Sequence, residues 1–170
     1  MKGNFKQLLQ NIRCFIFDVD GVLTNGSIVA MPGELYRIMN IRDGFALKEA
    51  VNSGYKIIII SGGKSDSVRS RLVNLGIKDV YLGIENKSEK MDDLILEYDL
   101  KLEEVLYMGD DLPDYTVMKR AGVPCCPADA VPEIKEISLY VSPIKGGEGC
   151  VRDIIEQVMR LHGKWPDFKS

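Results

Sequence analysis

Carboxylate side chains gather in two short segments of this chain, and each segment directly follows an apolar run. Asp18 and Asp20 flank a single valine and precede a glycine, while Asp110 and Asp111 follow the second run, with Asp114 close behind. An isolated Asp-x-Asp pair is a polar turn at the end of a strand about as often as it is part of a functional site. Converging carboxylates would repel one another, and Mg²⁺, which prefers oxygen ligands, would relieve that repulsion. The two segments therefore indicate a candidate magnesium site.

Other polar residues are candidates for contacts with an anion. Ser61 follows the four isoleucines 57–60 and precedes two glycines, so its hydroxyl could donate where the backbone can approach closely. Lys87 lies before a helical pattern, and a lysine beside carboxylates and a metal can hold phosphoryl oxygens. Taken alone, either residue would be an ordinary surface group. Arg42 is either a ligand contact or part of a helix start, with Asp43 at the positive end of the helix dipole.

Composition excludes several other functions. The 170 residues carry 22 basic and 25 acidic side chains, a net charge of −3, so the basic excess typical of nucleic-acid binding is absent. No apolar run approaches the roughly 20 residues of a membrane span, and the N-terminus lacks the apolar region of a secretory signal. The four cysteines form no C-x-x-C pair, and the single histidine leaves no standard zinc cage or Ser-His-Asp centre. We expect a cytoplasmic protein, one domain over 1–170, with no nucleic-acid or membrane partner.

The elements that must position these residues alternate between short apolar runs and helical patterns. Strands are expected at 14–17, 57–60, 80–82, 105–108, 123–125 and, peripherally, 139–141. Helices are expected around 47–51, 65–76, 91–98, 113–120 and 151–159. This alternation predicts an α/β fold, a Rossmann-like, doubly wound, mostly parallel sheet. A β-hairpin is expected at about 25–37, turning at Pro32-Gly33. Ligands of such sheets bind at the carboxyl ends of the strands, where Asp18, Ser61 and Asp110 fall.

In order and spacing, these motifs resemble the haloacid dehalogenase phosphohydrolase superfamily. The block DVDGVLT at 18–24 carries most of that resemblance, and Ser61, Lys87 and GDD at 109–111 follow in the same order. Further segments are similar to one subfamily, the 3-deoxy-D-manno-octulosonate 8-phosphate phosphatases. They are NIRDG at 40–44, ENK at 85–87, MGDDLPD at 108–114, PADAVPEI at 127–134 and GGEGCVRD at 146–153.

The resemblance implies a role for each matching residue. Asp18 would be the nucleophile that forms an aspartyl-phosphate, and Asp20 would be the general acid and then the general base. Asp18, the backbone carbonyl of Asp20 and Asp110 would hold Mg²⁺. Ser61 and Lys87 would grip the transferring phosphoryl group.

The resemblance also implies supporting and substrate-binding residues. Asp111 and Asp114 would orient Lys87 and metal-bound waters. The substrate would be a small phosphorylated sugar acid. Its candidate contacts are Arg42, Gly62, Lys64, Gly147 and Arg152.

Members of the superfamily often carry a cap domain that seals the site, and neither gap between the motifs of this chain has room for one. An uncapped site must be closed by a large substrate or by another subunit, because phosphoryl transfer benefits from excluded water. The resemblance to the subfamily implies a homotetramer in which the hairpins form a central barrel and a neighbour's C-terminal segment covers each site. Here that segment would be the tail and helix at about 143–163, whose glycines suit either a close approach to a ligand or a turn.

Two positions depart from the subfamily and leave alternatives open. Gly63 and Glu148 stand where many members have arginines, which would be expected near the carboxylate of an acid sugar. A nine-carbon 2-keto-3-deoxy sugar acid 9-phosphate is therefore an alternative substrate to the eight-carbon acid. A receiver-type phosphoacceptor domain is a further alternative. The order of the acidic blocks argues against it, because the D-x-D-G block comes first.

Overall fold

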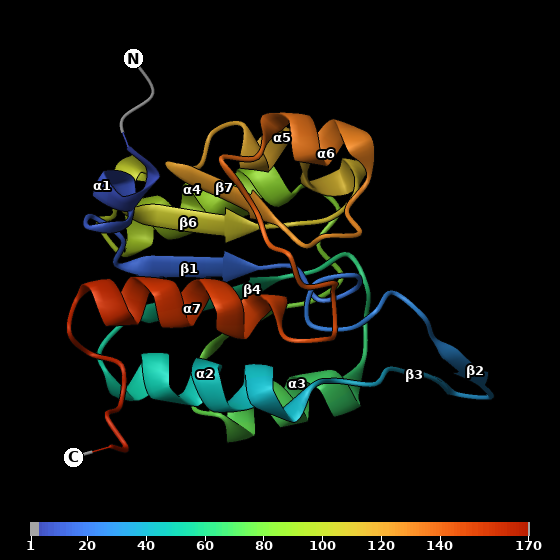
Figure 1. Cartoon of the computed structure of the whole chain (residues 1–170). Coiled ribbons are helices and arrows are strands. Elements are labelled where there is room, and N and C mark those ends of the chain that lie inside the picture. The colour runs from blue at the N-terminus through green and yellow to red at the C-terminus, as the bar shows by residue number, and fades with distance from the viewer. Residues whose placement is uncertain (1–3, 170) are drawn as a thin grey trace.

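A six-stranded parallel sheet forms the centre of the protein, as a computed structural model describing residues 4–169 shows (Figure 1). The sheet order is β5-β4-β1-β6-β7-β8. Its strands are β1 (Cys14–Phe17), β4 (Lys56–Ile60), β5 (Asp79–Tyr81), β6 (Val105–Met108), β7 (Val123–Cys126) and β8 (Tyr140–Val141). Counted without the hairpin, this is the 3-2-1-4-5-6 order of a doubly wound sheet. The predicted fold class is confirmed, and each predicted strand lies within one residue of its expected bounds.

Helices cover both faces of the sheet, because β1 and β4 bury successive side chains on opposite faces. Phe15, Phe17, Ile57 and Ile59 belong to one apolar core, whereas Cys14, Ile16, Ile58 and Ile60 belong to the other. The first core is covered by α1 (Phe5–Leu9), α2 (Ile41–Asn52), α3 (Asp66–Asn74) and α7 (Cys150–Leu161). The second is covered by α4 (Lys87–Glu97), α5 (Tyr115–Met118) and α6 (Pro132–Ile137).

Several helix ends follow the expected local chemistry, and others correct it. The Ser65 hydroxyl caps α3, and Gly76 adopts φ +94° just beyond that helix. Lys87 was expected in the loop before α4, but it is the first residue of that helix. Asn86 caps the helix. The helix expected at 113–120 is a 3₁₀ turn (Leu112–Asp114) followed by the short α5. The short helices α1 and α6 were not predicted, because five or six residues carry too little periodicity.

The predicted hairpin is present and extends past the carboxyl ends of the strands (Figure 1). Its arms, β2 (Val29–Met31) and β3 (Glu34–Tyr36), pair antiparallel around Gly33 at φ +91°. Within residues 4–169 this hairpin is the insertion between β1 and α2, and α3 and β5 fill the stretch from β4 to α4. The expected lack of a cap domain is therefore confirmed. Apolar side chains of the hairpin face solvent: Ile28, Val29, Met31, Leu35 and Tyr36.

Across residues 4–169, no helix is both long and apolar enough to cross a membrane.

A buried carboxylate joins α2 to the start of α7. Gly149 offers no side chain to cap α7, and Asp43 of α2 supplies one, accepting a hydrogen bond from the Arg152 N–H at 2.8 Å. The side chain is 1% exposed, and within the described chain its Oδ2 has no hydrogen-bond partner. Burial raises the pKa of Asp43 to about 6, although the hydrogen bond from Arg152 opposes the rise. Asp43 thus caps α7, but its ionised form lowers the stability of the folded state.

We expect the substitution Asp43→Asn to change how stability depends on pH. The folded state holds the Asp43 proton more tightly than the unfolded chain does, so wild-type stability falls as pH rises from about 4 through about 6. Relative to D43N, the wild type should lose on the order of 2–3 kcal/mol of unfolding free energy across that range. Urea unfolding at pH 4 and pH 7 measures the difference. The exposed Asp93→Asn is the matched control, and a wild-type-to-D43N difference that is constant with pH would contradict the prediction.

Candidate active site

Three strand ends bring the predicted site residues to one edge of the sheet. The ladder continues one residue beyond each strand: Asp18 N–H donates to the Met108 carbonyl at 3.1 Å, and Ser61 N–H donates to the Tyr81 carbonyl at 2.9 Å. This edge lies where the strand order reverses between β1 and β6, the usual ligand position of such sheets. A cavity of about 280 Å³ opens there, lined by Asp18, Asp20, Gly26, Ser61, Gly62, Gly63, Ile84, Lys87, Asp110, Asp111, Pro113 and Asp114.

Lys87 ties two of the carboxylates together beneath this cavity. Its Nζ lies 3.0 Å from Asp18 Oδ1 and 2.8 Å from Asp114 Oδ1, and its side chain is 4% exposed. Asp114 also accepts hydrogen bonds from the Tyr107 hydroxyl at 2.8 Å and from the Asp110 N–H at 3.1 Å. Lys87 lies at the start of α4 and Asp114 lies in a 3₁₀ turn after β6. From these positions both side chains reach the carboxyl end of β1, where Asp18 lies. Asp114 thus contacts Lys87 directly, and the orienting role that the resemblance implies for it stays a prediction.

Negative charge at the site exceeds what Lys87 neutralises. Burial, with repulsion from Asp114, raises the pKa of Asp18 to about 7 against the attraction of Lys87. Burial, with repulsion from Asp18 and Asp114, raises the pKa of Asp110 to about 8. Burial alone would lower the pKa of Lys87, but Asp18 and Asp114 raise it above its ordinary value. Oxygen atoms of Asp18, Asp110 and Asp114 lie within 4.8 Å of one another. This crowded all-oxygen set fits a divalent cation.

The backbone conformation and the close approach of Asp110 require a glycine at the end of the D-x-D-G block. Gly21 adopts φ +85°, and a Cβ built there would lie 1.8 Å from Asp110 Oδ2. A side chain at this position would push the Asp110 carboxylate out of the site. Thr24 secures the same turn, since its buried hydroxyl accepts from the N–H groups of Gly21 at 3.4 Å and Gly26 at 3.2 Å. The turn therefore presents Asp20 while Asp110 packs against its backbone.

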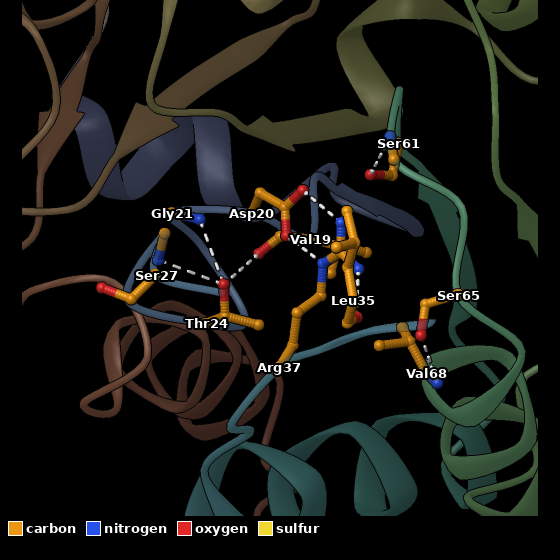
Figure 2. A network of polar contacts seen from close by, with 12 residues as sticks. Val19, Asp20, Gly21, Thr24, Ser27, Leu35, Arg37, Ser61, Ser65 and Val68 are labelled. Atoms are coloured by element: carbon orange, nitrogen blue, oxygen red, sulfur yellow. Dashed lines mark hydrogen bonds and ion pairs between the residues drawn. The ribbon is translucent and has the colours of Figure 1, made fainter. Parts of the chain in front are cut away.

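Arg37, which the sequence analysis missed, holds the Asp20 carboxylate in a two-point ion pair (Figure 2). Arg37 Nε donates to Asp20 Oδ1 at 2.6 Å, and Nη2 donates to Oδ2 at 3.1 Å. Gly63 makes room for this pair, because a Cβ there would lie 2.7 Å from Arg37 Nη2 and 2.9 Å from Asp20 Oδ2. A side chain at 63 would therefore displace the Arg37–Asp20 pair. The sequence signal that could have indicated this pair is an arginine at the end of the predicted hairpin, which begins a few residues after the D-x-D block.

The predicted supporting and substrate-binding residues are only partly brought together. Gly62 lines the cavity at Asp18, and Asp111 lies at its rim, where its carboxylate accepts from the Leu112 N–H at 2.7 Å. Within residues 4–169 the ion pairs of Lys87 are with Asp18 and Asp114, so the role predicted for Asp111, beside metal-bound waters, stays a prediction. Lys64 instead lines a cavity of about 500 Å³ beside the hairpin, because its side chain runs over Gly83.

Three other residues predicted to bind substrate lie away from Asp18 in the single chain. Arg42 and Arg152 line a separate cavity of about 670 Å³ with Glu148, because they sit at the starts of α2 and α7. Arg152 pairs with Glu156 at 3.2 Å. Gly147 packs on its own chain and donates its N–H to the Val22 carbonyl at 3.0 Å, so in the single chain the glycine segment closely approaches backbone. Their substrate-binding roles therefore stay predictions, since the single chain does not bring these residues to Asp18.

Comparison with known proteins gives consistent matches. A family model described as haloacid dehalogenase-like hydrolase matches residues 79–153. The 3-deoxy-D-manno-octulosonate 8-phosphate phosphatase KdsC of Escherichia coli (strain K12) is 38% identical over 162 residues, 95% of this chain and 86% of that protein. The crystal structure of the Yersinia pestis phosphatase of that name has a TM-score of 0.91 at 34% identity, covering 94% of this chain and 86% of its own. The Moraxella catarrhalis phosphatase of that name, in complex with a magnesium ion, a phosphate ion and a KDO molecule, has a TM-score of 0.90 at 28% identity, covering 95% and 93%.

The chain belongs to the haloacid dehalogenase-like hydrolases, the class that its fold and its carboxylate site define. Within that class it belongs to the family of the KdsC phosphatases, and it is a phosphatase. The sheet order also excludes the receiver alternative, because receiver domains have the order 2-1-3-4-5 and this sheet has 3-2-1-4-5-6.

Proposed function

We propose that this protein is a magnesium-dependent phosphatase that releases phosphate from 3-deoxy-D-manno-octulosonate 8-phosphate through an aspartyl-phosphate on Asp18. The observation that carries the proposal is the convergence of Asp18, Lys87, Asp110 and Asp114 at one sheet edge, in a chain 38% identical to a phosphatase named for that substrate. The Moraxella relative, in complex with magnesium, phosphate and KDO, supports both the metal and the class of substrate.

Asp18 attacks phosphorus in the first half-reaction, and the bond from phosphorus to the sugar oxygen breaks. Asp20 gives a proton to that leaving oxygen. Lys87 holds phosphoryl oxygens, and the Ser61 hydroxyl, at the end of β4, donates to another. Asp18, Asp110 and the backbone carbonyl of Asp20 would hold Mg²⁺, which when bound neutralises charge on the phosphoryl oxygens.

Water reverses these roles in the second half-reaction. Asp20, now ionised, takes a proton from a water molecule as that water attacks the aspartyl-phosphate. The bond between Asp18 and phosphorus breaks, which frees phosphate and restores the Asp18 carboxylate. One carboxyl group thus carries one proton through both halves, while Lys87 and Asp114 keep the nucleophile in place.

The test is phosphate release measured with Mg²⁺ and with a chelator in its place. We expect release only with Mg²⁺. We also expect kcat/KM for the eight-carbon substrate to exceed that for nine-carbon 9-phosphates by about tenfold or more, roughly 1.4 kcal/mol of transition-state stabilisation. Release that ignores the chelator would contradict the metal assignment. A preference for the nine-carbon acids would move the substrate to the alternative that Gly63 and Glu148 leave open.

We further propose that the hairpins assemble the chain into a homotetramer in which a neighbouring subunit helps to close each site. The exposed apolar side chains of the hairpin support this, since such patches mark interaction surfaces. We also propose a cytoplasmic location. Its support is that Cys14, Cys125, Cys126 and Cys150 are free and buried.

We expect Val29→Lys to lower the oligomeric mass, because it places a charge on the hairpin face that would pair with other subunits. Val29 is 51% exposed in the single chain, and so is Val73 on α3, which makes Val73→Lys a matched control. Light scattering after size-exclusion chromatography should show a smaller species for V29K and an unchanged one for V73K. Equal masses for V29K and the wild type would argue against the hairpin as the interface.

A further inference from the structure

Asp20 must move a proton in both half-reactions, yet its carboxylate is already paired with an arginine. We propose that Arg37 is a positioning residue that grips Asp20 Oδ1 and presents Oδ2 as the oxygen that carries the proton. This inference rests on the proposed function and names a residue that acts through Asp20. Its first support is the asymmetry of the ion pair, with 2.6 Å from Arg37 Nε to Oδ1 and 3.1 Å from Nη2 to Oδ2.

The two contacts differ in length, so Oδ1 is the more tightly held oxygen, and Oδ2, with the longer hydrogen bond from Nη2, is the one that we assign to proton transfer. A carboxylic acid can still accept a hydrogen bond through the oxygen that bears no proton, so Oδ1 can keep its bond to Nε in both protonation states. The proton then resides on Oδ2. In the first half-reaction it passes from Oδ2 to the leaving oxygen as the bond from phosphorus to that oxygen breaks, and in the second a proton from water returns to Oδ2. Oδ2 lies beside the Ser61–Gly63 turn, which lines the cavity above Asp18.

The guanidinium is itself held in place. The Arg37 side chain is 6% exposed, and its Nη1 donates to the Leu35 carbonyl at 2.9 Å, so all three of its nitrogens are bonded (Figure 2). The Asp20 hydrogen bond raises the pKa of Arg37 further above its ordinary value, and the group stays charged. Arg37 is therefore a fixed cation with a planar fork, which an ammonium group does not reproduce.

The hairpin that carries Arg37 is anchored on the core at a second point. Glu34 accepts hydrogen bonds from the Ser65 hydroxyl at 3.0 Å, the Ser67 hydroxyl at 2.8 Å and the Ser67 N–H at 3.2 Å, at the start of α3. The β3 arm thus contacts α3 through Glu34, next to the hairpin turn, and the turn after β1 through Arg37, just beyond the other end of the strand. These two contacts give Arg37 a defined direction toward Asp20.

Two variants disturb the pair from opposite sides. Arg37→Met removes the fork while keeping an unbranched side chain. Gly63→Ala leaves Arg37 intact but puts a methyl group 2.7 Å from Nη2 and 2.9 Å from Asp20 Oδ2, and since both contacts are side-chain ends, the pair yields and the backbone need not. The matched control is Arg120→Met, which removes another two-point arginine–aspartate pair, with Asp92, exposed and outside the cavity.

The experiment compares two phosphate esters by kcat/KM, which reports the first half-reaction. The 8-phosphate of the sugar acid needs a proton on its leaving oxygen, whereas p-nitrophenyl phosphate needs almost none. We expect R37M to lower kcat/KM about 100-fold for the sugar phosphate and less than about fivefold for the nitrophenyl ester. G63A should show the same substrate dependence with smaller losses, R37K should recover part of the activity, and R120M should match the wild type.

A double-mutant comparison separates positioning from a general structural role. If Arg37 acts through Asp20, then R37M added to Asp20→Asn should cost no further activity. Equal losses for the two esters, or losses that add to those of D20N, would overturn the inference even with an active wild type. If R37M does not fold, G63A decides by the same comparison. A wild type that hydrolyses neither ester with Mg²⁺ present would instead overturn the proposed function itself.

Discussion

Asp18→Asn should abolish phosphate release, lowering kcat by at least about 10⁴-fold, because an amide cannot form the aspartyl-phosphate. The fold should remain, since asparagine keeps an oxygen that accepts from Lys87 and removes a charge from a crowded site. Burial and Asp114 raise the pKa of Asp18 to about 7, so its ionised form is unfavourable near neutral pH. The melting temperature of metal-free D18N at pH 7.5 should therefore equal or exceed that of the wild type.

Trapping the intermediate gives the decisive readout for this variant. Wild-type protein quenched in acid during turnover should carry a phosphoryl group on the peptide that contains Asp18, and D18N should carry none. Asp93→Asn, exposed on α4, serves as the control and should behave as the wild type. Normal turnover by D18N, or a phosphoryl group found on another residue, would refute the assignment of the nucleophile.

Lys87→Met should destabilise the protein by about 3–5 kcal/mol and remove most activity, because it leaves Asp18 and Asp114 buried without their cation. Lys87 is the group whose Nζ contacts both carboxylates, at 3.0 and 2.8 Å. Urea unfolding at pH 7.5 measures the loss. Mg²⁺ should reduce the difference between variant and wild type, because a bound cation offsets part of the same excess of negative charge.

Lys90→Met on the same helix is the matched control for this substitution. Lys90 lies over the Tyr81 ring with its Nζ 4.0 Å from the centroid, so its loss should cost less than about 1 kcal/mol. A K87M protein as stable as the wild type would show that the ion pairs of Lys87 with Asp18 and Asp114 contribute nothing to the free energy of unfolding. The double variant K87M with Asp114→Asn should recover part of the loss, since it removes one of the stranded charges.

The sheet, and the gathering of the carboxylates and Ser61 at one edge of it, could be predicted from the sequence because their signals are local. Each of these polar clusters follows an apolar run of strand length, and parallel strands present their carboxyl ends at one edge. Knowing that Asp18 and Asp110 follow such runs was therefore enough to place them together. The hairpin was predictable for the same reason, since Pro32 and Gly33 determine its turn within a few residues.

Side-chain pairs between distant elements were decided only by the tertiary structure. Asp20 and Arg37 are 17 positions apart, and Asp43 and Arg152 are 109 apart. Whether such groups meet depends on how the hairpin leans on α3 and how α2 packs on α7, and no periodicity in the chain encodes those angles. On that account Arg42 and Arg152 line a different cavity from Asp18 in the single chain, which their sequence positions did not show. The sequence by itself thus determined which groups could do the chemistry, and the packing of the elements determined which neighbours orient them.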